Sequence, residues 1–286
     1  MSVFLAQNSY GKSRVRLVKV EREGGRHDVF DLTVDVALEG DFRAAHEDGD
    51  NALIYATDTM KNSVYALARQ GPVDPPEAFG IRLAGHFLAR VPHVERVHVS
   101  IAQHPWERLS VDGAAYPTAF RRAGEERRIA RVSATRDNVG VEAGVEEMTV
   151  LKTAQSGFVG FMRDDLTTLK ETDDRLFATA VRATWRFSAT EGVDWNESWA
   201  ESRRALLETF ATHDSLSVQH TLFAMGRAVI ERRPEVDEVS LSLPNKHHLL
   251  VDLSPFGLDN PNQVFVSTTE PYGLIEATIV RDSELY

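Results

Sequence analysis

The segments "RVPHVERVHVSIAQH" (90–104) and "RRPEVDEVSLSLPNK" (232–246) are two versions of one strand pattern. Identical residues stand 142 positions apart at Arg90 and Arg232, Pro92 and Pro234, Val94 and Val236, Val97 and Val239, and Ser100 and Ser242. A repeat of about half the chain length is too long for a solenoid unit. It indicates a duplicated domain.

The residues around both segments follow one order of elements, judged from apolar periodicities of two and of 3.6. The first half predicts strands 14–23 and 27–40, helices 61–70 and 76–91, and strands 94–103 and 125–135. The second half predicts strands 146–155 and 176–188, helices 196–213 and 217–233, and strands 236–243, 247–253 and 273–280. We therefore expect an α+β protein with two tandem β-β-α-α-β-β repeats, 1–137 and 138–286. A helix pair should cover one face of each antiparallel sheet.

The composition limits the possible partners. Of 286 residues, 42% are apolar and 26% charged, which is typical of a soluble globular protein. The net charge of −11 argues against nucleic acid and against an anionic membrane surface as partners. An anionic ligand would therefore need a locally positive pocket. Because cysteine is absent, disulfides, thiolate nucleophiles and cysteine metal sites are excluded.

The ends of the chain bear on its location. The start, "MSVFLAQNSYGK" (1–12), has no apolar core long enough for a signal peptide, and no apolar run reaches membrane-spanning length. The tail "DSELY" (282–286) is not a peroxisomal "SKL" address. We expect a cytoplasmic protein.

Three patterns resemble ligand sites only weakly. "YGKS" (10–13) looks like the end of a phosphate-binding loop, but Ala6 stands where that motif needs its first glycine. "HEDGDN" (46–51) has the composition of a calcium loop without the ligand spacing. His98 and His104 share one face of a strand without a third ligand nearby, so we expect no metal site.

Polar residues interrupt the strand pattern near the end of the second repeat. In "SLPNKHHLLVDL" (242–253), Pro244 cannot donate to a ladder and therefore predicts a strand edge or a bulge. The interruption at 244–248 presents the amide of Asn245 and the imidazole of His247 two residues apart. Such a break allows polar groups to point into a pocket instead of pairing in a sheet.

Three more clusters are unusual, although each is typical of a structural role when taken alone. Lys12 stands just before an alternating strand. Thr57 and Asp58 lie between an apolar strand and a helix, where either residue can be the helix N-cap. Segment 151–175 combines two phenylalanines at spacing three with many charges, as a surface loop with an aromatic anchor would.

Together, these clusters resemble the urate oxidase (uricase) family over nearly the whole chain. The order and approximate spacing of the family are kept by "YGK" (10–12), "ATDTMKN" (56–62), "PPEAFG" (75–80), "SGFVGFMRDDLTTLKETDDR" (156–175), "SVQ" (217–219) and "SLPNKH" (242–247). The 156–175 stretch and "SLPNKH" are specific motifs. Leu166 and Ala154 depart from the family, which has an aromatic and a hydroxyl residue there.

The resemblance implies a fold, an activity and an assembly. The fold is the tunnelling fold (T-fold), in agreement with the two repeats inferred above, and the assembly is a homotetramer around a tunnel. The activity is oxidation of urate by O2 to 5-hydroxyisourate with release of hydrogen peroxide. The expected partners are therefore urate and O2, and no metal or organic cofactor is expected.

The resemblance also implies which residues bind the substrate. Arg175 would bind the pyrimidine-ring edge of the anionic purine through two parallel hydrogen bonds. Gln219 would offer a donor and an acceptor to the neighbouring amide edge, and Val218 its backbone N–H. Phe158 would stack on the purine ring.

The implied catalytic residues are Lys12, Thr57 and His247, joined in a proton relay. Thr57 and Asp58 would contact the imidazole-ring edge through backbone N–H groups, and Asn245 would face the position of O2 and then water. Lys12 acts as a base through Thr57 only where burial removes its proton, and otherwise it stays charged and stabilises the anion. In the family, Lys12, Thr57 and Asp58 come from one subunit and the other site residues from a neighbour.

Two alternatives stay open at this point. A non-catalytic purine-binding T-fold protein would need mainly Arg175, Gln219 and Phe158, whereas the additional presence of Lys12 and Thr57 favours turnover. A pterin-handling relative of the same fold would need a metal and a carboxylate that anchors the pterin, and no convincing ligand triad is evident.

Overall fold

The computed structural model describes residues 3–282. The tail at 283–286, on which the expected absence of a peroxisomal address rests, lies outside the described residues, as do Met1 and Ser2. The chain divides into two compact units. The first comprises the described residues up to Gly144 with Arg186–Ser198, and the second comprises Val145–Trp185 and the described residues from Trp199 onward. The division of the sequence into repeats 1–137 and 138–286 stays a prediction.

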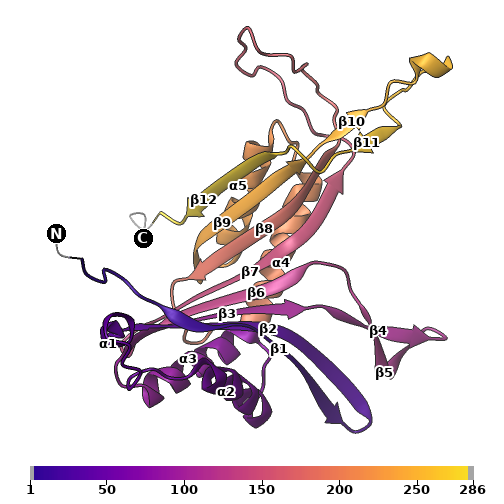
Figure 1. Cartoon of the computed structure of the whole chain (residues 1–286). Coiled ribbons are helices and arrows are strands. Elements are labelled where there is room, and N and C mark those ends of the chain that lie inside the picture. Colours follow the sequence, from indigo (N-terminus) through magenta and orange to yellow (C-terminus); the bar gives the residue numbers. More distant parts are fainter. Residues whose placement is uncertain (1–2, 283–286) are drawn as a thin grey trace. The chain divides into compact units, whose positions relative to one another are not determined.

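The first unit contains an antiparallel sheet with the strand order β1-β2-β3-β6. Its elements are β1 (Tyr10–Glu23), β2 (Arg26–Gly40), α1 (Arg43–Glu47), α2 (Thr57–Gln70), α3 (Pro76–Arg90), β3 (Val94–His104), β4 (Trp106–Val111), β5 (Ala114–Arg122) and β6 (Arg127–Ala134). Helices α2 and α3 cover one face of the sheet (Figure 1). Helix α2 contacts β1, and α3 contacts β3 and β6.

Four further strands, in the order β7-β8-β9-β12, lie mostly in the second unit. The elements that lie wholly or mostly in this unit are β7 (Val139–Lys152), β8 (Phe177–Phe187), α4 (Trp195–Thr212), α5 (Val218–Arg232), β9 (Val236–Lys246), β10 (His248–Leu250), the 3-10 helix η1 (Ser254–Phe256), β11 (Phe265–Ser267) and β12 (Gly273–Val280). Helix α5 contacts β9 and β12. None of the described helices is long and apolar enough to cross a membrane.

The second helix and the third strand have the same lengths in the two repeats. Strands β3 and β9 each have 11 residues, and helices α3 and α5 each have 15. Both strands bury the same alternating positions, beginning with Val94 and Val97 in β3 and with Val236 and Val239 in β9. The predicted β-β-α-α-β-β order is confirmed in both halves of the chain.

The second helix of each repeat approaches the sheet through a glycine. A Cβ atom at Gly80 of α3 would lie 2.8 Å from Val132 Cγ2, and one at Gly226 of α5 would lie 2.6 Å from Ile279 Cδ1. Real Cβ atoms do not come this close to their neighbours. Glycine therefore allows each helix to pack directly against the last strand of its repeat.

In each repeat, an arginine near the end of the last strand donates hydrogen bonds to backbone carbonyls at the connection between the second helix and the third strand. In the first repeat, the Arg136 guanidinium donates to the carbonyl oxygens of Leu88, Val91, Pro92 and Val94. In the second, Arg281 donates to those of Ile230, Arg233 and Val236. Carbonyls at the end of a helix lack intrahelical donors, so one planar guanidinium satisfies several of them together.

The structure adds a hairpin that the sequence did not predict. Residues of β4 and β5 pair from Trp106 with Arg122 to Val111 with Ala114. Nearly all side chains of the two strands are exposed. The alternation that reveals a half-buried strand is therefore missing from their sequence.

The break predicted at 244–248 is wrong in extent. Strand β9 continues to Lys246 because β12 pairs with it there, with Leu274 opposite Pro244 and Gly273 opposite Asn245. Only His247 separates β9 from β10, which pairs with β11 in a separate two-stranded sheet. A partner strand thus maintains the extended backbone across the proline.

Replacing Arg136 by alanine should lower the free energy of unfolding by about 1–3 kcal/mol, because several carbonyl groups lose a charged donor. Arg136→Lys should give a smaller loss, since a lysine keeps the charge but cannot reach several carbonyls in one plane. Chemical denaturation measures both variants, with Arg281→Ala as the equivalent change in the second repeat. Wild-type stability in Arg136→Ala would contradict this role.

Candidate active site

A pocket of about 340 Å³ lies in the second unit. Six of the nine predicted site residues line it, namely Phe158, Arg175, Val218, Gln219, Asn245 and His247. They come from the long segment between β7 and β8, from the first turn of α5 and from the end of β9. The structure therefore brings these six residues together, while their individual roles stay predictions.

Arg175 places a half-buried positive charge at this pocket. Its backbone N–H donates to the Ser156 carbonyl at 2.8 Å, which anchors the residue. Its side-chain Nε and Nη2 atoms are buried and have no hydrogen-bond partner among the described residues. Burial lowers the pKa of the Arg175 guanidinium because the charged form loses hydration. Two buried guanidinium nitrogens without acceptors in the described part of the chain would suit an anion with two acceptor atoms.

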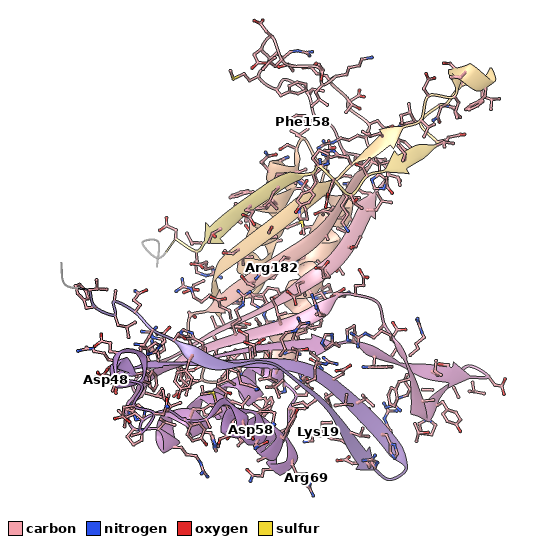
Figure 2. All side chains as sticks on the ribbon, in the orientation of Figure 1. Lys19, Asp48, Asp58, Arg69, Phe158 and Arg182 are labelled. Carbon is pink, nitrogen blue, oxygen red and sulfur yellow. The ribbon has the colours of Figure 1, made fainter. Side chains whose placement is uncertain are left out.

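Phe158 gives the pocket an aromatic wall. The Arg175 guanidinium lies 5.4 Å from the centre of the Phe158 ring, within cation–π range. On another side, the ring stacks on Phe161 with centroids 4.9 Å apart and planes 10° apart. Backbone bonds between Phe158 and Thr172 in both directions (2.6 and 3.3 Å) tie the two ends of the segment together. Figure 2 shows Phe158 in this segment, which extends beyond the sheet.

The first turn of α5 adds backbone donors. Val218 and Gln219 are its first two residues, and the Ser217 N-cap accepts a hydrogen bond from the His220 N–H (3.1 Å). The first N–H groups of a helix lack intrahelical acceptors and carry partial positive charge. They suit an anion next to Arg175. The Gln219 side chain has no hydrogen bond to any described residue and is exposed.

Asn245 and His247 complete the pocket at the end of β9. The residue opposite Asn245 in β12 is Gly273, so no cross-strand side chain stands beside the amide. The His247 carbonyl accepts from the Thr268 N–H at 2.9 Å. This bond holds the backbone at the step between β9 and β10, where the chain leaves the main sheet.

The other three predicted residues, Lys12, Thr57 and Asp58, belong to the first unit. Thr57 and Asp58 are the first two residues of α2, and their N-cap, Ala56, has no side-chain acceptor. The opening N–H groups of α2 are therefore uncapped. The Asp58 carboxylate is engaged with Lys61 and with Asn62 (3.0 Å). Contact through the backbone, as predicted for Asp58, is thus compatible with this arrangement (Figure 2).

The charge of Lys12 acts close to the start of α2. The hydrogen bond from Lys61 is the main cause that lowers the pKa of Asp58, and the charge of Lys12 contributes in the same direction. Lys12 stands directly before an irregularity in the pairing of β1 with β2. The preceding Gly11 passes so close to the Val36 carbonyl that a Cβ atom would lie 1.9 Å from its oxygen. Glycine is therefore required beside Lys12.

Sequence reasoning missed several lining residues. These are Leu169, Thr172, Leu176, His248, Leu249 and Ile275. Thr172 lies in "KETDDR", so its motif was a usable signal. The others are mostly apolar residues that no chemical pattern singles out. Ser156, whose buried Oγ has no partner among the described residues, was also not singled out.

The described residues contain no group of three or more His, Asp and Glu side chains with metal-ligand geometry. The histidine pair considered from the sequence is engaged otherwise. His98 Nε2 lies 2.9 Å from Glu39 Oε1. His104 lies 2.8 Å from Thr33 Oγ1 and 2.9 Å from an Arg122 nitrogen.

A comparison with known families matches two long stretches of the chain. The sequence model of the family described as uricase matches residues 8–133 and 141–276. The chain belongs to the uricase family. The uricase from Arthrobacter globiformis is 49% identical over 98% of this chain and 91% of that protein. The uricase from Aspergillus flavus is 39% identical over 96% of each.

Solved structures of uricases have the same fold. The crystal structure of uricase from Arthrobacter globiformis has a TM-score of 0.94 at 49% identity, covering 99% of this chain and 96% of that one. The urate oxidase of Bacillus sp. TB-90 has a TM-score of 0.85 at 23% identity, covering 96% of this chain and 100% of that one. The second likeness concerns the fold alone. The expected tunnelling fold is confirmed.

Arg175→Met should stabilise the ligand-free protein by about 1 kcal/mol, because buried N–H groups without acceptors are unfavourable by about 1–3 kcal/mol. The same variant should lose the rise in Tm that urate gives the wild type, since a ligand stabilises only a protein that binds it. Thermal unfolding with and without urate measures both effects. Arg182→Met, which alters an exposed arginine of β8, is the matched control and should show neither. A less stable ligand-free Arg175→Met would contradict the interpretation.

Proposed function

We propose that the chain oxidises urate with O2 to 5-hydroxyisourate and hydrogen peroxide, as a urate oxidase. The observation that carries the proposal is the Arg175 guanidinium, whose buried Nε and Nη2 atoms have no acceptor among the described residues, in a pocket walled by Phe158. Membership of the uricase family supports the same conclusion. The reaction balances with one water: urate, O2 and H2O give 5-hydroxyisourate and H2O2.

The binding residues hold the purine by its edges and its face. Arg175 donates two parallel hydrogen bonds to the pyrimidine-ring edge, where a urate anion carries acceptors. Gln219 and the backbone N–H of Val218 bind the adjoining edge, so the first turn of α5 adds its partial positive charge. Phe158 stacks on the ring and sets its plane. In a chain with a net charge of −11, this local positive field is what admits an anion.

The catalytic residues remove protons from urate. Loss of protons raises the electron density of the purine until it transfers two electrons to O2 directly, so no metal or organic cofactor takes part. Lys12 accepts a proton by way of the Thr57 hydroxyl. Asn245 orients first O2 and then the water that adds to the oxidised purine at C5. His247 completes the relay that carries protons to the reduced oxygen.

The two groups of residues meet between neighbouring chains of a homotetramer in this proposal. Lys12, Thr57 and Asp58 of one chain then complete the pocket of the next chain. The supporting observation is where these residues lie. The pocket of the second unit contains the urate clamp, which we define as Phe158, Arg175, Val218 and Gln219. The lysine and the hydroxyl of the relay belong to the first unit. The cytoplasmic location expected from the sequence stays a prediction.

The test follows urate and peroxide in air. Purified protein, exhaustively treated with a chelator, should remove the ultraviolet absorbance of urate and release one hydrogen peroxide per urate. Binding of urate without loss of absorbance would instead favour the non-catalytic purine-binding alternative. Activity that is lost on chelation and restored by one metal would overturn the cofactor-free mechanism.

Variants of the clamp and of the relay should differ in kind. Arg175→Ala should weaken urate binding by roughly a hundredfold or more, because an anion loses a bidentate partner in a closed pocket. Thr57→Ala and Lys12→Met should instead lower kcat while urate still binds. Steady-state kinetics and anaerobic urate titration separate the two effects. A Lys12→Met variant that changes only binding would contradict the assignment of the base.

Mixing two inactive variants tests the shared site. A Lys12→Met chain and an Arg175→Ala chain, co-expressed in equal amounts, form mixed pairs in which one site carries both changes and the other carries neither. With random pairing, about half the pairs are mixed, so roughly a quarter of wild-type activity should return. Verified mixed oligomers without activity would rule out a site shared in this way.

A further inference from the structure

The hydroxyl of Tyr10 bonds to both backbone groups of a single residue. The Tyr55 N–H donates to it at 2.8 Å, and it donates to the Tyr55 carbonyl at 3.2 Å. The hydroxyl is therefore acceptor and donor at once, which fixes the position of the Tyr55 backbone in two directions. Burial raises the pKa of Tyr10, which keeps its O–H available as a donor.

The same cluster holds the chain just before α2. The Tyr10 ring packs edge-on against Phe42 with centroids 4.7 Å apart, and Phe42 packs against His93 at 5.3 Å. His93 Nε2 lies 2.6 Å from the Leu53 carbonyl. Phe42 is only 1% exposed, so this is a packed cluster and not a surface contact. The segment that leads into α2 is tethered at Leu53 and again at Tyr55.

The spacing connects this tether to the predicted relay. Tyr10 stands two residues before Lys12 in β1, and Tyr55 stands two residues before Thr57. Side chains two apart in a strand lie on the same face, so Tyr10 and Lys12 project together. Their partners across β2 are Leu38 and Val36, which are buried. Both side chains therefore lie on the face that α2 covers.

We propose that Tyr10 is a positioning residue, whose hydroxyl sets Lys12 against the first turn of α2. The inference rests on the proposed function, in which Lys12 and Thr57 pass a proton. A proton relay needs heavy atoms within about 3 Å of each other, so a small movement of the α2 start relative to Lys12 is enough to slow it. Tyr10 does not touch the substrate in this proposal.

A second tyrosine provides a matched control. The Tyr65 hydroxyl donates to the Arg16 carbonyl at 3.3 Å, which also joins α2 to β1, but further along both elements. Tyr65→Phe and Tyr10→Phe each delete one oxygen and keep the ring. A general tether between α2 and β1 would make the two variants behave alike. A positioning role makes only Tyr10→Phe defective in turnover.

The experiment compares wild type, Tyr10→Phe and Tyr65→Phe. Tyr10→Phe should lower kcat about tenfold, shift the pH dependence of kcat by about half a unit or more, and leave anaerobic urate binding within about twofold. Tyr65→Phe should keep wild-type values of all three. The inference is overturned if Tyr10→Phe retains both kcat and its pH dependence, or if the two variants lose activity equally.

A readout without turnover separates this inference from the proposed function. After reductive methylation with a 13C label, the NMR resonance of Lys12, assigned with Lys12→Arg, should move in Tyr10→Phe and stay in Tyr65→Phe. If the wild type does not oxidise urate but the resonance moves, the proposed function fails and the placement of Lys12 by Tyr10 stands. If the wild type is active and the resonance stays in both variants, the placement fails.

Discussion

A half-buried arginine whose Nε and Nη2 atoms have no acceptor in the described part of the chain is the constraint on which the proposed site depends. Arg175 has two N–H groups that nothing among the described residues accepts from. Water would satisfy them in an open surface site, but burial removes most of it. The segment between β7 and β8 keeps the guanidinium there, through the Ser156 carbonyl and the ladder between Phe158 and Thr172. The polypeptide thus maintains an unfavourable arrangement, which would become favourable on binding of the anion in the proposed function.

Each repeat contributes the N-terminus of one helix to the proposed site. Helix α5 presents the backbone of Val218 and Gln219 beside Arg175. Helix α2 presents the backbone of Thr57 and Asp58, with no side-chain cap at Ala56. The proposed site therefore combines the second helix of one repeat with the first helix of the other. Two copies of one fold supply non-equivalent groups, as recognition of an asymmetric purine requires.

The fold was predictable wherever burial shapes the sequence. Helix α3 packs against β3, and α5 packs against β9. Each of these elements therefore has one buried face, and its apolar periodicity predicts its secondary structure. The sequence of the β4–β5 hairpin lacks this apolar periodicity because nearly all of its side chains are exposed. The extent of β9 depends on β12, which lies almost 30 residues further along the chain. Local sequence could not reveal that a distant strand maintains the backbone at Pro244.

The site was predictable from motifs but not from spacing alone. Nothing in "KETDDR" indicates that Arg175 is buried without a partner, because that depends on a fold which brings α5, β9 and a long segment to one place. The spacing of Phe158 and Phe161 was visible in the sequence, but it did not show that the two rings stack on each other and that Phe161 supports the aromatic wall. Resemblance to a family carried these assignments. The geometry adds a physical reason for the arginine, which is that its donors lack acceptors.

The separation of clamp and relay has a consequence for where oxidation takes place. In the proposed function, the pocket of the second unit attracts the urate anion through Arg175 and the start of α5. Of the predicted catalytic residues, this pocket contains only His247. Lys12 and Thr57, which would remove the first proton, are in the first unit. Under the shared-site proposal, a lone chain binds the urate anion but cannot remove a further proton from it. A urate anion that keeps this proton is a poor reductant of O2. The reaction that makes peroxide is then confined to assembled chains, and urate bound across two chains stabilises their association by mass action.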